Sequence, residues 1–204
     1  MTEREIKNHF KGADLVLSLT DSFNAQSGIN LIALKYNIPT IWSGWYAKSR
    51  TAELFFQIPY FTESCFRCCM SARYIMNKKK EIKVSSNCNT IFHSQLLDGF
   101  IGFIALAILH RNHPVNDGDE SLEFAQFFNE MKNKNDIIEY NFFQFKVHPL
   151  GGNTLFDKAY KNSDMNSHNF VSYWQKIEAE IPKNGYKLCP DCRGKLQKLT
   201  LKNS

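Results

Sequence analysis

Two Cys-x-x-Cys pairs constrain this chain more than any other feature of its sequence. The first pair is Cys65 and Cys68, and the second pair, Cys189 and Cys192, lies close to the other end of the chain. Because a Cys-x-x-Cys turn directs two sulfurs to one side of a tight loop, two such turns can surround a tetrahedral zinc ion. A structural zinc ion would then hold a late segment against an early one and close a loop too long for a local zinc finger.

The sequence leaves two questions about these cysteines open. Cys69 follows Cys68 directly, so either sulfur can be the second ligand of the first pair. The alternative to zinc is a set of buried or disulfide-linked cysteines. The chain opens on a charged stretch without the apolar run of a secretory signal, and its longest apolar run, 100–109, is too short for a membrane span. We therefore predict a cytoplasmic protein that does not enter a membrane, where thiolate–metal sites are favoured over disulfides.

Composition predicts one folded unit. The 204 residues are 43% hydrophobic and include 17 Phe, which is enough for a core that zinc supports rather than creates. The net charge of +5 is mild and its lysines are dispersed, so we do not expect a nucleic-acid partner. We treat 1–204 as a single domain, in which 1–111 holds a βαβ core, the first Cys pair and a hydrophobic helix. The part 112–204 holds an insertion, a strand, a helix and the second Cys pair.

The first forty residues predict a βαβ unit and hence an α/β fold. A short apolar run, 14–19, is typical of a buried parallel strand and ends in a turn-rich triplet, 20–22, that can cap a helix. The helix, 24–36, is expected to bury Ile29, Ile32, Ala33 and Tyr36 and to stop at Asn37 and Pro39, before a strand at 40–44. Further predicted elements are strands 52–58 and 140–147, a charged loop 76–86, helix 94–109, a short helix within 121–131, a loop 153–166 and helix 168–181. In helix 94–109, Gly99 and Gly102 lie about one turn apart and leave a surface without side chains, which would allow another element to pack closely.

The chain carries no sequence motif for binding nucleotide phosphates. An α/β nucleotide-binding sheet normally begins with a strand, a glycine-rich turn and a helix, whose amides cradle the phosphate. Neither G-x-G-x-x-G nor a P-loop occurs in this sequence, and the pair Gly151-Gly152 fits neither pattern.

The order of the features resembles the second half of the ThiF/MoeB/HesA family, the ubiquitin-activating-enzyme-like adenylyltransferases. The resemblance covers 14–109 well and 140–192 loosely. The matching features are the run Asp14–Asp21, Ile29-Asn30, Asn37-Ile38-Pro39, Pro59 followed by Cys65-Phe66-Arg67-Cys68, Asn87-Cys88-Asn89-Thr90, the glycine-containing hydrophobic helix and Cys189-Pro190-Asp191-Cys192.

The resemblance implies a partial Rossmann-like fold of the ThiF type and an ATP-dependent activity. In this family ATP activates the C-terminal carboxylate of a small ubiquitin-like, β-grasp protein, which is then passed to a sulfur or amine nucleophile. A homodimer or a sister subunit is also implied. The half with the glycine-rich turn would precede Met1, so we expect this chain to be inactive alone and to meet Mg-ATP only when that half is supplied.

Two residues acquire candidate roles from the resemblance, and the activating-enzyme hypothesis suggests a role for a third, Arg50. Asp21 matches an acid that positions magnesium and the ATP phosphates, although an Asp in this turn could equally be the N-cap of the following helix. Cys88 matches a cysteine that some members use for thioester or persulfide transfer, and the alternative is an inert thiol. Arg50 could stabilise phosphate charge, or it could simply be solvated.

The sequence leaves three functional interpretations. The first is the zinc-containing half of an activating enzyme. The second is a non-catalytic pseudoenzyme that binds a ubiquitin-like protein or a sister subunit. It is favoured by Gln26, where the family usually has Arg, and by four aromatic residues able to form an interface: Trp42, Trp45, Tyr46 and Trp174. The third is a zinc-ribbon nucleic-acid module, which the distant ligands and the diffuse charge disfavour.

Overall fold

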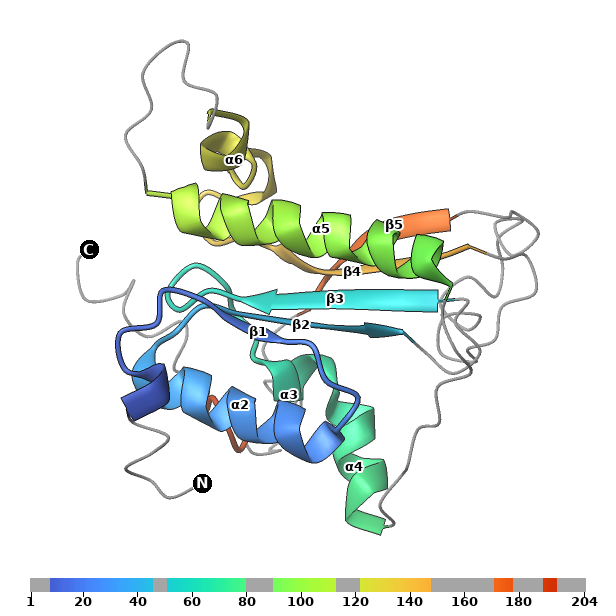
Figure 1. Ribbon diagram of the computed structural model, residues 1–204. Helices are drawn as coiled ribbons and strands as arrows, with labels where there is room; N and C mark the ends of the chain where they lie inside the picture. The colour runs from blue at the N-terminus through green and yellow to red at the C-terminus, as the bar shows by residue number, and fades with distance from the viewer. Residues whose placement is uncertain are drawn as a thin grey trace.

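A five-stranded sheet forms the centre of the protein, with helices on both of its faces (Figure 1). The structure is a computed structural model and describes residues 8–45, 51–79, 90–112, 122–147, 171–177 and 189–193. Helices α2, α3 and α4 lie on one face of the sheet, and α5 lies on the other face with α6 beside it. The protein is therefore a mixed α/β fold.

The predicted βαβ unit is present. Strand β1 (Val16–Ser18) runs parallel to β2 (Thr40–Trp45), and α2 (Phe23–Tyr36) connects them. The Oγ of Ser22 accepts a hydrogen bond from the Ala25 N–H at 3.3 Å and so caps the first turn of the helix. Asn37 adopts the left-handed conformation with φ of 54° and ends the helix. Local signals thus set both ends of α2.

The rest of the sheet is antiparallel. Strands β3 (Thr51–Gln57), β4 (Tyr140–Lys146) and β5 (Val171–Lys176) follow β2 in sheet order. Between β3 and β4 the chain forms α3 (Phe66–Cys69), α4 (Ser71–Lys79), α5 (Ile91–His110), α6 (Leu122–Gln126) and the 3-10 helix η1 (Asn129–Met131). The predicted loop at 76–86 therefore begins as the end of α4, and the predicted loop 153–166 lies outside the described residues.

The predicted helix at 168–181 is wrong, because Val171–Lys176 form strand β5. β-Branched and aromatic residues favour extended structure, and β4 supplies a partner along the whole of β5. Phe143 of β4 and Trp174 of β5 lie opposite each other with ring centroids 4.8 Å apart. This cross-strand pairing with a distant segment decided the conformation.

Two hydrophobic clusters lie on the two faces of the sheet. The cluster on the α5 face contains Ile41, Leu54, Phe56, Phe143, Phe145, Ile101, Ile104 and Ile108, and the cluster on the α2 face contains Ala33, Trp42, Phe55, Phe66, Met70 and Phe142. The tryptophans predicted for an interface belong to this core. Trp42 is 2% exposed, and Trp45 and Trp174 pack against the α5 cluster, whereas Tyr46 lies outside the described residues.

The buried side of α2 differs from the predicted apolar face. Gln26, Asn30 and Ala33 are its buried residues, while Leu31 is 55% exposed. Gln26 has hydrogen-bond partners in this buried position. Its side-chain Nε2 donates to the main-chain carbonyl of Thr20 at 2.7 Å, and its main-chain carbonyl accepts from Trp42 Nε1 at 3.2 Å. Ala33 is buried as predicted and Ile29 packs against the α2-face cluster, while the polar residues Gln26 and Asn30 share the buried side with them.

Helix α5 is longer than the apolar run at 100–109 indicated. Among the described residues it is the one helix whose length and composition would let it cross a membrane, and 28% of its most apolar window is buried. Core helices of soluble proteins can have the same length and apolar composition, and α5 packs Leu97, Ile101 and Ile104 against the sheet. Gly99 and Gly102 have open space in place of the close packing partner that we expected.

Candidate metal centre

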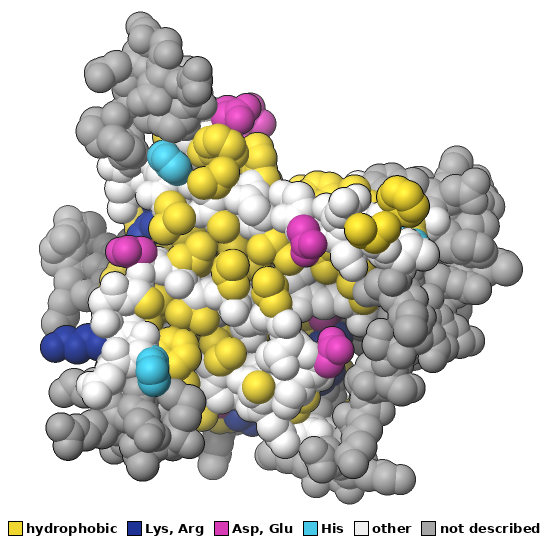
Figure 2. Space-filling view, in the orientation of Figure 1, with side chains coloured by type: hydrophobic (Ala, Val, Ile, Leu, Met, Phe, Trp, Pro, Cys, Tyr) yellow, Lys and Arg dark blue, Asp and Glu magenta, His cyan; other side chains and the backbone are white. Residues whose placement is uncertain are grey.

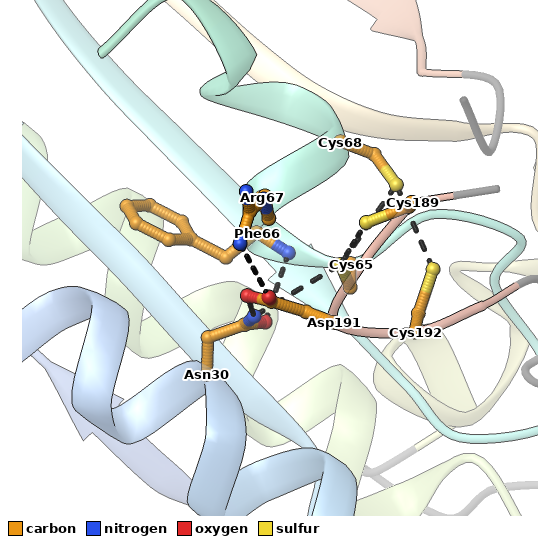
Figure 3. A network of polar contacts seen from close by, with 8 residues as sticks. All are labelled: Asn30, Cys65, Phe66, Arg67, Cys68, Cys189, Asp191 and Cys192. Atoms are coloured by element: carbon orange, nitrogen blue, oxygen red, sulfur yellow. Dashed lines mark hydrogen bonds and ion pairs between the residues drawn. The ribbon is translucent and has the colours of Figure 1, made fainter. Parts of the chain in front are cut away.

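Two turns from distant parts of the chain bring four cysteines together (Figure 3). Cys65 is the N-cap of α3, and the N–H groups of Cys68 and Cys69 both donate to its carbonyl, at 2.9 and 3.2 Å. The second turn is closed by a 2.8 Å hydrogen bond from the N–H of Arg193 to the carbonyl of Cys189. Each turn therefore presents the two sulfurs of its pair on one side, as the spacing predicted.

The four sulfurs form a compact buried group. The Sγ atom of Cys65 lies 3.8 Å from those of Cys68 and Cys189, and the Sγ atoms of Cys68 and Cys192 are 3.7 Å apart. All four sulfurs lie within 4.8 Å of one another and could hold a metal ion. Cys69 is not a member of the group, and the separations are too long for disulfide bonds, whose S–S length is about 2.05 Å.

A polar network fixes the second turn to the rest of the protein (Figure 3). Asp191 lies between the two cysteines of this turn and accepts hydrogen bonds from Arg67 Nη1 at 2.7 Å and from Asn30 Nδ2 at 2.9 Å. Asn30 is fully buried, and its Oδ1 accepts from the N–H of Phe66 at 3.2 Å. Helix α2, the start of α3 and the Cys189–Cys192 turn are thereby held in one arrangement.

The same network reaches the sulfurs and the neighbouring helix. Asn30 Nδ2 lies 4.0 Å from the Sγ of Cys65, close enough to donate to a thiolate. The Arg67 guanidinium also lies over the ring of Tyr74, with its carbon 4.7 Å from the ring centroid. Residues that bond to the ligands of a metal site, without touching the metal, orient those ligands, and their loss commonly weakens metal binding.

The protonation of the cysteines follows from their mutual contacts. The hydrogen bond to Cys189 raises the pKa of Cys65 and that of Cys192, and burial adds to both effects. The pKa of Cys189 is lowered instead, because its thiolate accepts hydrogen bonds from Cys192, Cys65 and Cys68. Because a metal binds cysteines as thiolates, metal binding to this group would release the protons that the cysteines hold.

The other predicted site residues are not brought to this centre. Asp21 is exposed and lies in the turn between β1 and α2, separated from the end of β1 by Leu19 and Thr20. The N-cap of α2 is Ser22, so Asp21 is not the capping residue. Asn30, beside the cysteines, lies about two helical turns further along α2. Arg50 and Cys88 lie outside the described residues.

Sequence reasoning did not assign a role to Asn30, Arg67 or Asp191. The only available signal was position, because Asp191 and Arg67 lie inside the two Cys-x-x-Cys turns. Comparison with known proteins adds no further assignment: no protein-family model matches the chain, and no curated protein matches it at a significant level. The resemblance to the ThiF/MoeB/HesA family therefore stays a prediction.

Replacing Asp191 with alanine is expected to weaken metal binding without abolishing it. The change removes the acceptor for both Arg67 and Asn30, so the second turn loses its orientation while all four sulfurs remain. We expect a loss of about 10- to 100-fold in metal affinity, measured by competition with a chelator of known affinity. Glu123→Ala, an exposed acid on α6, is the matched control. An unchanged affinity in Asp191→Ala would show that the network does not support the metal.

Proposed function

We propose that this chain is the zinc-containing C-terminal part of a ThiF-like adenylyltransferase, which activates the C-terminal carboxylate of a ubiquitin-like β-grasp protein with ATP. The observation that carries the proposal is the union of two distant Cys-x-x-Cys turns into one four-sulfur group beside a βαβ unit. Neither feature alone separates this class from others. Their combination, in the order found along the sequence, supports a partial Rossmann-like fold of the ThiF type.

Zinc is the metal that we propose for the four cysteines. A regular tetrahedron with zinc–sulfur bonds of about 2.3 Å has edges of about 3.8 Å. Three of the sulfur–sulfur distances are 3.7 to 3.8 Å, which supports this coordination. Four protein ligands leave no position for substrate, so the zinc would be structural rather than catalytic. In the reducing cytoplasm, where we propose that the protein works, the thiols would remain available to the metal.

Asp21 is the residue that we propose for contact with Mg-ATP. It follows the carboxyl end of β1, and ligands of α/β sheets bind at the carboxyl ends of parallel strands. A carboxylate is also a suitable ligand for magnesium. Arg50 would stabilise phosphate charge and Cys88 would accept the activated acyl group or sulfur. The phosphate-binding glycines are not in this sequence and would come from another segment.

Exchange between pyrophosphate and ATP tests this activity. We expect the chain alone to catalyse no exchange, because it lacks the backbone donors that hold the phosphates. When a nucleotide-binding half and a β-grasp substrate are supplied, exchange should appear, and Asp21→Asn should lower its rate by about a hundredfold. Glu123→Gln is the control that should leave the rate unchanged. Robust exchange by the isolated chain would contradict the proposal.

A non-catalytic subunit is the alternative function, and Gln26 favours it. The side chain of Gln26 is buried and engaged with the Thr20 carbonyl, so it stabilises the turn after β1 and does not reach toward a ligand. If this alternative is correct, Asp21→Ala and Cys88→Ser would leave the binding of a ubiquitin-like partner or sister subunit unchanged. They would also leave the partner's own activity unchanged.

A further inference from the structure

Gln57, the last residue of β3, places an amide group inside the protein. The residue is 0% exposed, and within the part of the chain that the structure describes neither its Nε2 nor its Oε1 has a hydrogen-bond partner. The charged side chains seen in Figure 2 lie at the surface, where solvent satisfies them, whereas bulk solvent does not reach this amide. Because an unpaired buried amide destabilises a protein, Gln57 indicates that a polar molecule binds beside it.

The amide of Gln57 lies on the face of the sheet that carries the metal centre. Side chains alternate along a strand, so Gln57 shares a face with Phe55. The ring centroid of Phe55 is 6.3 Å from that of Phe66, which directly follows Cys65. On the same face, Ile177 packs both against the α2-face cluster and against the four cysteines. Gln57 therefore belongs to the layer that contains the four sulfurs.

Asn141 of β4 adds a second buried amide at this place. Its Nδ2 donates to the main-chain carbonyl of Phe56, the neighbour of Gln57, at 3.2 Å and to the Oγ of Ser64 at 2.9 Å. The orientation of the Asn141 amide is thereby fixed, because a carbonyl can only accept. Its Oδ1 is buried and has no donor among the described residues. The border between β3 and β4 therefore offers a donor on Gln57 and acceptors on both amides.

The type and number of these groups select water as the ligand. An anion would need more donors than one amide nitrogen, and a hard cation such as Ca²⁺ would need about six to eight oxygen ligands. An apolar molecule would leave the amide atoms unpaired. Water both donates and accepts, and a buried water typically makes about three hydrogen bonds to groups of this kind.

Water at this border would support the first cysteine turn from the side of the sheet. Asn141 holds Ser64, and Ser64 directly precedes Cys65, the N-cap of α3. The network around Asp191 holds the metal centre from α2 and from the second turn. Since residues that orient metal ligands influence metal affinity, a change at Gln57 should reach the metal through Asn141.

We propose that a buried water bridges the amides of Gln57 and Asn141 and that Gln57 is thereby a positioning residue for the metal centre. The water accepts from Gln57 Nε2 and donates to Asn141 Oδ1. Asn141 in turn keeps Ser64 and Cys65 in place. The inference goes beyond the proposed function, because it concerns the support of the four cysteines and requires no nucleotide, adenylation or ubiquitin-like partner.

A crystal structure of the metal-loaded wild-type protein at about 1.5 Å resolution tests the bridge directly. We expect an ordered water within about 2.7 to 3.2 Å of both Gln57 Nε2 and Asn141 Oδ1. A direct hydrogen bond between the two amides, or a border without an ordered water, would overturn the proposal.

The stability of Gln57→Leu distinguishes a bridged amide from an unpaired one by its sign. Leucine is similar to glutamine in size but has no polar side-chain atom. If the amide were unpaired, the substitution would remove an unfavourable group and raise the denaturant midpoint of unfolding. We expect a lower midpoint, because the variant loses the bridge and leaves Asn141 Oδ1 without its donor. A raised midpoint would contradict the bridge.

Metal affinity separates a positioning role from a contribution to folding alone. Under conditions in which the protein stays folded, Gln57→Leu should weaken metal binding by about tenfold in competition with a chelator. Gln95→Leu, at an exposed position on α5, is the matched control and should change neither the midpoint nor the affinity. Equal metal affinities of the two variants would show that Gln57 does not position the metal centre.

Discussion

Substituting both Cys189 and Cys192 with serine is expected to abolish stoichiometric metal binding and to destabilise the protein strongly. The sulfur pair Cys65–Cys189 joins positions 124 residues apart. In the chain-entropy model, releasing a cross-link over a loop of that length lowers the free energy of unfolding by about 5 kcal/mol. The wild type should carry one metal ion per chain, and the double variant none.

Metal analysis together with chemical denaturation measures both effects. Cys69→Ala is the matched control, since Cys69 adjoins Cys68 but does not belong to the four-sulfur group. It should keep one metal ion per chain. Removing the metal from the wild type with a chelator should reproduce the loss of stability, and adding zinc back should restore it. If the double variant retained the metal, or if the chelator had no effect on unfolding, the four cysteines would not form the metal site.

Replacing Trp42 with alanine is expected to cost about 3 to 5 kcal/mol of unfolding free energy. Its ring stacks on that of Phe66 with centroids 5.0 Å apart and contacts Phe55 at 5.7 Å. The indole N–H also bonds to the Gln26 carbonyl, so the substitution creates a cavity and leaves a buried acceptor unpaired. Trp42 thus connects β2 with α2 and with the helix that begins at the cysteines.

The Trp42 variant should also bind metal more weakly, because Phe66 lies between Cys65 and the rest of α3. Unfolding in denaturant and a chelator competition measure the two effects. Leu31→Ala, on the exposed side of α2, should change the unfolding free energy by no more than about 0.5 kcal/mol. A loss below about 1 kcal/mol in Trp42→Ala would mean that this cluster contributes little to the fold.

The parts of the fold with local causes were predictable. The apolar run before Thr20, the capping Ser22 and the left-handed Asn37 act within a few residues, so β1, α2 and β2 could be placed from sequence. Strands β3 and β4 and helix α5 were also predicted, with ends shifted by a few residues. The assignment failed at β5, whose strand conformation depends on pairing with β4.

The candidate site was also predictable only where local sequence determines it. The spacing of each Cys-x-x-Cys pair indicated a turn with two convergent sulfurs, and both turns are present. The sequence did not indicate that Asn30 would be buried beside them or that Asp191 would bond to it. Nor did it place Trp42 inside, because an aromatic side chain is equally suited to a core and to an interface.

The sequence by itself determined the βαβ unit and the two cysteine turns, because backbone capping, apolar runs and short turns act between near neighbours in the chain. Only the tertiary structure decided that Cys68 and not Cys69 joins the sulfur group, that β5 is a strand, and that the side chain of Gln57 is buried. Each of these outcomes depends on contacts between residues far apart in sequence, and such contacts form only when the layers on both faces of the sheet are packed.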